Sequence, residues 1–271
     1  MAPDPAIPSS QAHAASARIG EAARIRESET GTEQVRLFRQ PEWVVQFPWL
    51  FQATTGRSPV EVFDLSFFSS SPAATVWLRW RAVRDLTGFQ SVAHARQVHG
   101  STILVHGSLA AGILLADAAD GHLTQVPGVL LAVSVADCVP VFLVHPAPRV
   151  ITLLHAGWRS IAAGILERGV ERICQDAGPD PSQLHCHFGP AICGQCYEVG
   201  PEVHEALGLA RPDRNQPIDL RSALTRRALG LKIPAGQISV SAFCTRCDSK
   251  HFFSHRGGSP ERQMALLGIR P

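Results

Sequence analysis

The chain has 271 residues, of which 45% are hydrophobic and 18% are charged, and its formal net charge is +2 at pH 7. A near-neutral balance argues against a general nucleic-acid or membrane-surface role, because both need a basic patch. No apolar run approaches the roughly 20 residues of a membrane span, and the first residues lack the pattern of a secretory signal.

The seven cysteines are an odd number, which without a signal peptide favours free or metal-bound thiols in a reducing compartment. We therefore expect a cytoplasmic protein, a monomer or a homodimer, that binds neither nucleic acid nor membrane.

Residues 1–40 are rich in Ala, Ser, Pro, Glu and Arg without a steady apolar stripe, so they predict a mobile N-terminal arm. Residues 41–271 contain no internal repeat or linker and predict a single domain that mixes strands and helices. Its first expected elements are a helix over 74–87, strands over 92–98 and 103–105, and a loop over 109–115.

The run Val129–Val135 is too uniformly apolar for a one-sided strand and predicts a strand buried on both faces. Residues 141–144 and 150–154 predict two more strands. After His155 the apolar residues follow a helical period, which predicts a helix that ends near Gly178. The remaining expected elements are strands over 185–188, 237–243 and 266–269, and helices over 202–209 and 221–231.

Each of three reactive residues, His99, Cys138 and His155, follows or closes a predicted strand. Two imidazoles and one thiolate leave the fourth tetrahedral position of a zinc ion open, as in catalytic zinc sites. The three residues are far apart in the sequence, so their spacing alone favours a buried cysteine and two ordinary histidines. Gly157 permits a close turn, and the helix start behind it offers unpaired N–H groups to an anion.

The sequence resembles the laccase-domain, or YfiH-like, family in segments that occur in the family's order from about Val44 to the end. The similar segments are 96–100 (Arg-Gln-Val-His-Gly), 136–140 (Ala-Asp-Cys-Val-Pro), 155–159 (His-Ala-Gly-Trp-Arg), 189–192 with 196–200, and 244–245 with 253–256.

This resemblance implies a mixed α/β (α+β) fold with a central mixed β-sheet and flanking helices. It implies a zinc-dependent purine nucleoside phosphorylase that cleaves adenosine, inosine, guanosine and methylthioadenosine with phosphate, and that also deaminates adenosine. The partners would be a purine nucleoside and phosphate. One catalytic Zn²⁺ would be held by His99, Cys138 and His155.

Candidate catalytic and substrate residues follow from the same segments. Asp137 would orient a ligand or act as a base, and the structural alternative is that it caps a turn. Arginines would hold phosphate against the sugar carbon and neutralise charge in the transition state. Asp120 matches an acidic position of the family. The substrate-binding candidates are Arg57, Gln97, Arg159, Ser254 and Arg256.

The chain departs from the family pattern at four places, which leave the metal triad intact and affect the substrate pocket. Family members carry Asn-Leu-Gly, an Asn-Arg pair, a glycine after His-Ala-Gly-Trp-Arg, and a Gly-Arg near the end. The chain has instead Asp64-Leu65-Ser66, Leu78–Arg81, Ser160 and Glu261-Arg262.

Other functions compete with this interpretation. A cysteine hydrolase would use Cys138 as the nucleophile, His155 as its base and Asp137 or another acid to orient the base, and it would need no metal. A non-catalytic, zinc-stabilised interaction protein would have a closed metal site and no turnover. A copper laccase would need an axial Met and several His-x-His pairs, whereas the chain has one such pair, at residues 185–187.

Two Cys-x-x-Cys pairs, Cys193 with Cys196 and Cys244 with Cys247, also suggest a four-cysteine zinc site. The usual zinc ribbon separates its pairs by roughly 15–20 residues, but here 47 residues lie between Cys196 and Cys244. We therefore predict free thiols at these positions and no second zinc.

Overall fold

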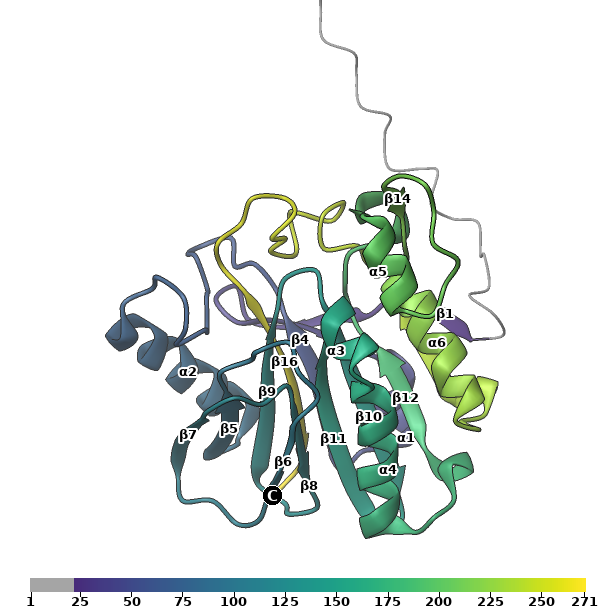
Figure 1. The fold of residues 1–271 in the computed structure, drawn as a ribbon. Helices are drawn as coiled ribbons and strands as arrows, with labels where there is room; N and C mark the ends of the chain where they lie inside the picture. Colours follow the sequence, from purple (N-terminus) through teal and green to yellow (C-terminus); the bar gives the residue numbers. More distant parts are fainter. Residues whose placement is uncertain (1–21) are drawn as a thin grey trace, which may run out of the picture.

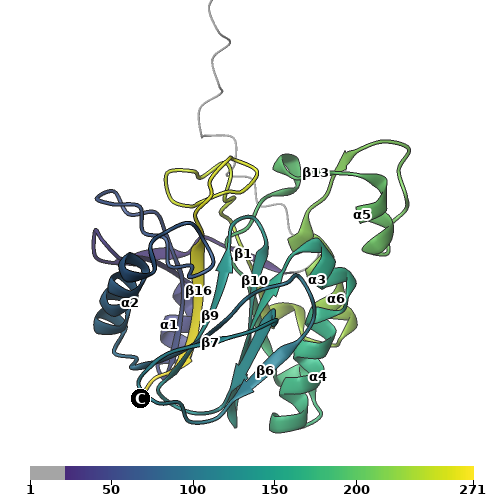
Figure 2. The ribbon, with the colours of Figure 1, turned by 60° about the vertical axis from the view of Figure 1, so that its left-hand side comes forward.

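The computed structural model describes residues 22–271, and the first part of the predicted N-terminal arm lies outside this range. The chain forms a mixed α/β fold, which confirms the predicted fold class. In place of one central sheet, two seven-stranded mixed sheets pack face to face. Helices cover the outer face of each sheet (Figures 1 and 2).

We call sheet I the seven-stranded sheet that contains β10 (Val139–Pro146), which begins directly after Cys138, and β11 (Arg149–Ala156), which includes His155. Its central strands β10 and β11 are antiparallel, with Pro140 opposite His155. At one side of β10, strands β12 and β15 run parallel to each other. The order across sheet I is β1 (Ala23–Ile25), β15 (Ile238–Ser241), β12 (His185–Phe188), β10 (Val139–Pro146), β11 (Arg149–Ala156), β8 (Gly121–Thr124) and β6 (Ile103–His106).

Sheet II holds the predicted two-face-buried strand at 129–135 next to the last strand of the chain, which pairs with it in antiparallel register. The order across sheet II is β2 (Ser28–Gly31), β3 (Arg36–Arg39), β4 (Leu50–Thr55), β16 (Gln263–Ile269), β9 (Val129–Val135), β5 (Ser91–Ala95) and β7 (Gly112–Ala116). A separate small ribbon pairs β13 (Glu198–Val199) with β14 (Gln216–Pro217).

Three apolar layers hold the fold together. One lies between the two sheets, one packs α2 on sheet II, and one packs α4 and α6 on sheet I. The helix α2 ends at Gly88, whose left-handed φ of 82° suits a glycine. The helices are α1 (Pro41–Gln46), α2 (Ala73–Thr87), α3 (Trp158–Ala162), α4 (Ile165–Ala177), α5 (Pro201–Ala206) and α6 (Leu220–Gly230), with 3₁₀ turns η1 (Pro181–Gln183), η2 (Gly194–Cys196) and η3 (Ala235–Gln237).

The predicted boundary of the N-terminal arm at residue 40 is wrong for residues 22–40. This stretch supplies β1 to the edge of sheet I and β2 and β3 to sheet II. The stretch also enters the interior, because Glu27 is buried and accepts hydrogen bonds from His187 and Ser241. The polar composition of this stretch gave no sign of these strands. Strand β2, for example, is exposed at all four positions and has no alternation of apolar and polar residues.

Two other expectations need correction. The segment predicted as a loop at 109–115 contains β7, which pairs in parallel with β5. The helix predicted to run from His155 to Gly178 is broken into α3 and α4, because Gly164 adopts a left-handed φ of 76°. In the described part of the chain, no helix is both long and apolar enough to cross a membrane.

Replacing Phe142 by alanine should test the contact between the sheets, because its ring is fully buried in that layer and stacks on His187. We expect a loss of about 3–5 kcal/mol in the free energy of unfolding, as for other buried Phe→Ala changes. Chemical denaturation measures it. The control is Val45→Ala on α1, where the side chain is 82% exposed and a change within about 0.5 kcal/mol is expected. Equal effects of the two changes would contradict this packing.

Candidate metal and substrate site

His99, Cys138 and His155 come together at one end of the sheets. Each offers one ligand atom, and these atoms lie within 4.8 Å of one another. Cys138 lies in the turn between β9 and β10, and His155 lies near the end of β11. Because β10 and β11 are antiparallel, the start of one lies beside the end of the other. His99 reaches the same point from the loop between β5 and β6.

The buried carboxylate of Asp120 holds two of these residues in place. It accepts hydrogen bonds from the backbone N–H groups of Val98, His99 and Gly100 at 3.2, 2.9 and 2.7 Å. The same carboxylate lies 2.9 Å from Nδ1 of His155. A carboxylate on one ring nitrogen leaves the other nitrogen for a metal and fixes the orientation of the ring. Asp120 is therefore as important for the geometry of the site as the three ligands, a role that the sequence indicated only weakly.

Gly157 lies where no side chain fits. A Cβ atom there would lie 2.9 Å from Sγ of Cys138 and 3.0 Å from Cδ2 of His99. Neither neighbour is the tip of a long flexible side chain, so the ligands themselves would have to move. The sequence predicted only a close turn at Gly157, and the structure adds that the glycine lets His99 and Cys138 approach this backbone.

The triad favours a thiolate at Cys138 beside a protonated ring at His155. Burial opposes ionisation of the Cys138 thiol, but His155 and His99 beside it lower its pKa to about 6. Burial likewise opposes protonation of His155, yet Cys138 and Asp120 raise its pKa to about 9. A sulfur that ionises easily next to two nitrogen donors fits the donor set of a catalytic zinc ion, which keeps one position for water or substrate.

Asp137 connects the triad to two later parts of the chain. Its φ is 89°, in the left-handed region. One carboxylate oxygen accepts a hydrogen bond from the Thr245 hydroxyl at 2.7 Å, and the other accepts one from the backbone N–H of Arg256 at 2.7 Å. Both oxygens are thus engaged, which favours a positioning role over the role of a base.

Three of the five predicted substrate residues make contacts that organise the chain. Arg57 donates to the carbonyl of Phe252 and to the Ser259 hydroxyl, so it braces the loop that carries Arg256. Gln97 exchanges hydrogen bonds with Ser134 on β9. Ser254 is buried, and its hydroxyl accepts a hydrogen bond from the Gly257 N–H.

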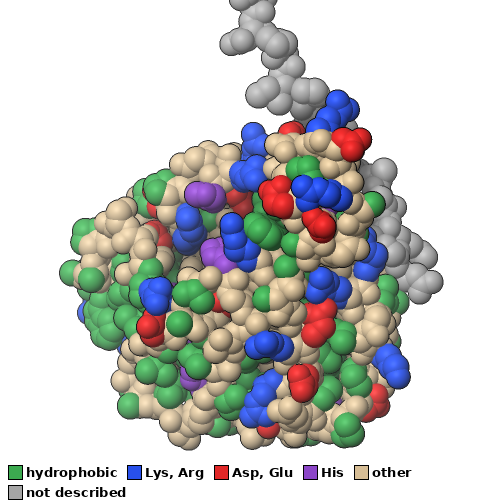
Figure 3. Space-filling view, viewed as in Figure 1, with side chains coloured by type: hydrophobic (Ala, Val, Ile, Leu, Met, Phe, Trp, Pro, Cys, Tyr) green, Lys and Arg blue, Asp and Glu red, His purple; other side chains and the backbone are tan. Residues whose placement is uncertain are grey.

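Arg159 and Arg256 remain exposed beside the triad. The Arg159 guanidinium lies 4.2 Å from the ring centroid of Trp158 and makes no hydrogen bond or ion pair within the described residues. The Arg256 guanidinium donates to the carbonyl of Glu198 and lies 4.9 Å from the centroid of Tyr197. In Figure 3, Lys or Arg side chains lie beside histidines near the top of the view, where Figure 1 places the C-terminal loop.

Tyr197 is a further candidate that sequence reasoning did not single out. Burial and the nearby charges of Cys138 and Asp137 raise its pKa to about 12, while Arg256 and Arg159 act in the opposite direction. The phenol therefore stays protonated at neutral pH and lies among these four groups. The segment at 196–200 was recognised as similar to the family, and that was the available signal.

The helix start after His155 is a weaker anion site than predicted. Because α3 has only five residues, its dipole is small, and the arginines are the stronger candidates to hold phosphate.

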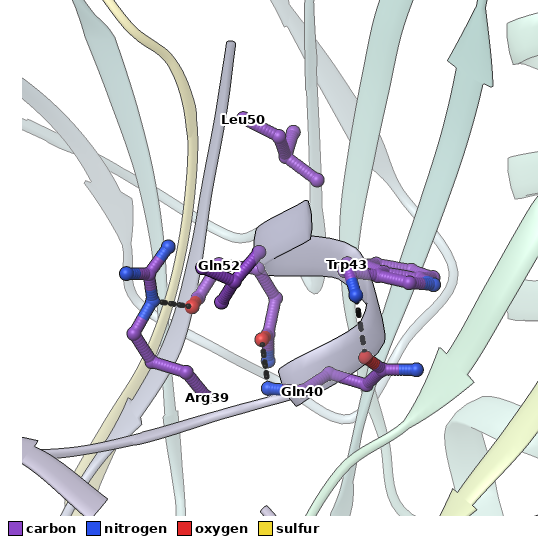
Figure 4. Close-up of a pocket in the computed structure, with 6 residues that line it drawn as sticks. Arg39, Gln40, Trp43, Leu50 and Gln52 are labelled. Atoms are coloured by element: carbon purple, nitrogen blue, oxygen red, sulfur yellow. Dashed lines mark hydrogen bonds between the residues drawn. The ribbon is translucent and has the colours of Figure 1, made fainter. Parts of the chain in front are cut away.

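Two hollows in the surface of the described residues lie away from the triad. One is lined by the start of β6 and the two residues before it, and by residues of α4 that include Arg168 and Glu171. The other, too small to hold a water molecule, lies at the start of α1, where the side chains of Gln40 and Gln52 accept hydrogen bonds from backbone N–H groups (Figure 4). Since its polar groups cap a helix and tie it to β4, we assign it a structural role.

The two Cys-x-x-Cys pairs, predicted from the sequence to be free thiols without a second zinc, come together in the fold. Although 47 residues separate Cys196 from Cys244, the sulfur atoms of Cys193, Cys196, Cys244 and Cys247 all lie within 4.8 Å of one another. All four are free thiols in the structure. The chain therefore contains a second cluster of metal-ligating groups.

Fold and site together define a two-sheet α/β protein with a candidate metal centre of two histidines and one cysteine. The profile of a family described as multi-copper polyphenol oxidoreductase laccase matches residues 50–270. A purine nucleoside phosphorylase of Deinococcus radiodurans is 35% identical over 246 residues, which cover 86% of this chain and 92% of that protein. The chain belongs to this laccase-domain family, which confirms the predicted resemblance.

Two further relatives match over shorter segments. The purine nucleoside phosphorylase YlmD of Geobacillus stearothermophilus is 35% identical over 164 residues, 56% of this chain and 60% of YlmD. The crystal structure of YlmD superimposes with a TM-score of 0.80, at 25% identity, over 90% of this chain and 100% of that one. Adenosine deaminase RL5, from an unknown prokaryotic organism, is 34% identical over 148 residues, 51% of this chain. The aligned segment spans 56% of the length of RL5.

Replacing Gly157 by alanine should weaken zinc binding at the triad roughly tenfold or more, comparable to the loss of a group that orients a metal ligand. Competition with a chromophoric chelator measures this affinity. Gly100→Ala is the matched control, because a Cβ there would lie 3.5 Å from Asp120 and 3.6 Å from Val98, both ordinary contacts. Unchanged affinity in Gly157→Ala would show that the three ligands do not bind one ion at this point.

Proposed function

We propose that the chain is a zinc-dependent purine nucleoside phosphorylase that cleaves adenosine, inosine, guanosine or methylthioadenosine with phosphate. The observation that carries the proposal is the convergence of His99, Cys138 and His155 beside two exposed arginines. Membership of the family and the names of the Deinococcus and Geobacillus relatives support the choice of reaction. The free cysteines fit a reducing, cytoplasmic setting.

In this proposal His99, Cys138 and His155 hold one zinc ion, which supplies a Lewis acid that stabilises developing negative charge. Asp120 keeps the His155 ring oriented through Nδ1 and keeps the His99 loop in place. Asp137 fixes the backbone of Arg256, so that its guanidinium stays beside Tyr197.

Phosphorolysis forms a bond from a phosphate oxygen to the anomeric carbon, while the bond from that carbon to the base nitrogen breaks. The purine leaves with the bonding electrons and takes up a proton. Arg159 and Arg256 bind the phosphate through charge-assisted hydrogen bonds. Tyr197, which keeps its proton, is the neutral donor among these groups.

Adenosine deamination is a second activity that we propose for the same site. In this reaction water adds to the purine and ammonia leaves, so phosphate plays no part. The name of the RL5 relative supports it.

A cysteine hydrolase remains the competing function, and one observation favours it. Cys138, His155 and Asp120 form a thiol, imidazole and carboxylate series in which the carboxylate orients the imidazole. Such an enzyme would work without metal. His99 has no role in that series, whereas the metal proposal uses all three residues of the cluster.

A product assay with metal analysis separates these functions. Protein with zinc bound should convert adenosine and phosphate into adenine and ribose 1-phosphate, lose this activity on chelation, and recover it when Zn²⁺ is restored. Cys138→Ala should abolish turnover and leave the fold largely intact, while Cys174→Ala, at a half-buried thiol on α4, should not change it. Turnover that survives chelation but not alkylation of Cys138 would favour the hydrolase.

Replacing Arg159 or Arg256 by alanine should raise the KM for phosphate or depress phosphorolysis by roughly tenfold or more. This is the effect of losing a charge-assisted hydrogen bond worth about 1.5–3 kcal/mol. Deamination should suffer less, since it uses no phosphate. The control is Arg226→Ala, an exposed arginine on α6. Equal loss of both activities would count against a phosphate role.

A further inference from the structure

The two Cys-x-x-Cys pairs meet because of the topology of sheet I. One pair follows β12 and the other follows β15, and these strands are parallel neighbours. The carboxyl ends of parallel neighbours lie at the same edge of a sheet, and a backbone bridge between Ala191 and Cys244 extends the pairing beyond the strands. The intervening residues form α5, β14 and α6, which return the chain to this edge.

We propose that Cys193, Cys196, Cys244 and Cys247 bind a second, structural zinc ion. Four sulfurs at about 2.3 Å from one tetrahedral ion lie about 3.8 Å apart. The four sulfurs lie within 4.8 Å of one another, and those of Cys196 and Cys247 are 3.4 Å apart. The arrangement is therefore close to that of a closed tetrathiolate site, and only small changes in the distances between the sulfurs are needed.

Backbone geometry around the cluster suits thiolate ligands. The N–H groups of Cys193 and Cys247 both point at Sγ of Cys244, at 3.2 and 3.4 Å. The guanidinium of Arg246 bonds to the carbonyl of Cys196 and brings a positive charge to a site where four thiolates outweigh one Zn²⁺. Such groups stabilise anionic sulfur.

The first pair is tightly fitted against the start of α6. A Cβ on Gly194 would lie 3.1 Å from Cβ of Asp219, the residue that caps this helix. The glycine lets the 3₁₀ turn between the two cysteines approach the helix. The metal would thus fasten the end of β15 to the segment that packs on α6.

The site would also fix groups beside the triad, a consequence that rests on the proposed function. Thr245, directly after Cys244, donates to Asp137. Tyr197, directly after Cys196, lies against the guanidinium of Arg256. With all four positions filled by protein, this ion would have no place for substrate, so its role is to position these residues.

Metal content tests the proposal independently of any nucleoside. The full chain is purified under reducing conditions, supplied with Zn²⁺, and examined by native mass spectrometry and elemental analysis. We expect two zinc ions in the unaltered protein and in Cys174→Ser, and one in Cys138→Ser, Cys196→Ser and Cys247→Ser. Loss of the second ion should lower the unfolding temperature in the last two variants but not in Cys174→Ser.

X-ray absorption at the zinc edge tests the proposal without any substitution in the four-cysteine cluster, so it does not depend on whether such a variant folds. Cys138→Ser should hold its remaining zinc with sulfur ligands alone, at about 2.3 Å. A nitrogen-containing shell in that variant, a single zinc ion in the unaltered protein that is lost in Cys138→Ser, or a disulfide within the cluster would overturn the proposal. Since neither method uses substrate, these results are distinct from the failure of phosphorolysis.

If the cluster positions the substrate groups, Cys247→Ser should raise the KM for phosphate and leave zinc at the triad in place. Cys174→Ser should change neither. An unchanged KM in Cys247→Ser, with the second zinc lost, would show that the site stabilises the fold without positioning Arg256.

Discussion

One buried carboxylate, that of Asp120, determines how the metal side of the site is built. It accepts three backbone hydrogen bonds from the His99 loop and contacts the ring of His155, so two strands and a loop share one charge. Burial alone disfavours this charge, but the hydrogen bonds from His155 and the backbone lower the pKa of Asp120. The same bonds hold His99 at a φ of 59°, a left-handed conformation that costs a non-glycine residue about 1–3 kcal/mol.

The carboxylate of Asp137 has the corresponding positioning role on the substrate side of the site. Asp137 joins the turn that carries Cys138 to Thr245 and to the Arg256 backbone. It too has a left-handed backbone. Of the two strained residues, His99 belongs to the triad and Asp137 directly precedes Cys138, and each is held by hydrogen bonds to segments distant in the sequence. Strain that is maintained by the surrounding structure is typical of functional sites, and here it fixes the directions of ligands that the loops alone would not fix.

The sequence predicted the parts of the fold that depend on local pattern. The apolar runs at 129–135 and 150–154 are strands, and the glycine at 88 ends a helix, because burial and backbone freedom act within a few residues. The sequence did not predict the features that depend on the order of strands in the sheets. The convergence of Cys196 and Cys247 follows from the pairing of β12 with β15, and β2 is an exposed strand without alternation. The family resemblance predicted that His99, Cys138 and His155 bind one metal ion. Their spacing in the sequence alone had favoured no metal site.

The position of β16 has a consequence for how the protein is made. This strand lies in the middle of sheet II, between β4 and β9, yet every other strand of the sheet precedes it in the chain. A ribosome must therefore synthesise six strands of the sheet before the one that joins them emerges. Until then β4 and β9 expose edges with unpaired backbone N–H and C=O groups, which are prone to pair with other chains. Sheet II can therefore close only after β16 has been synthesised, and the chain is open to wrong strand pairing until then.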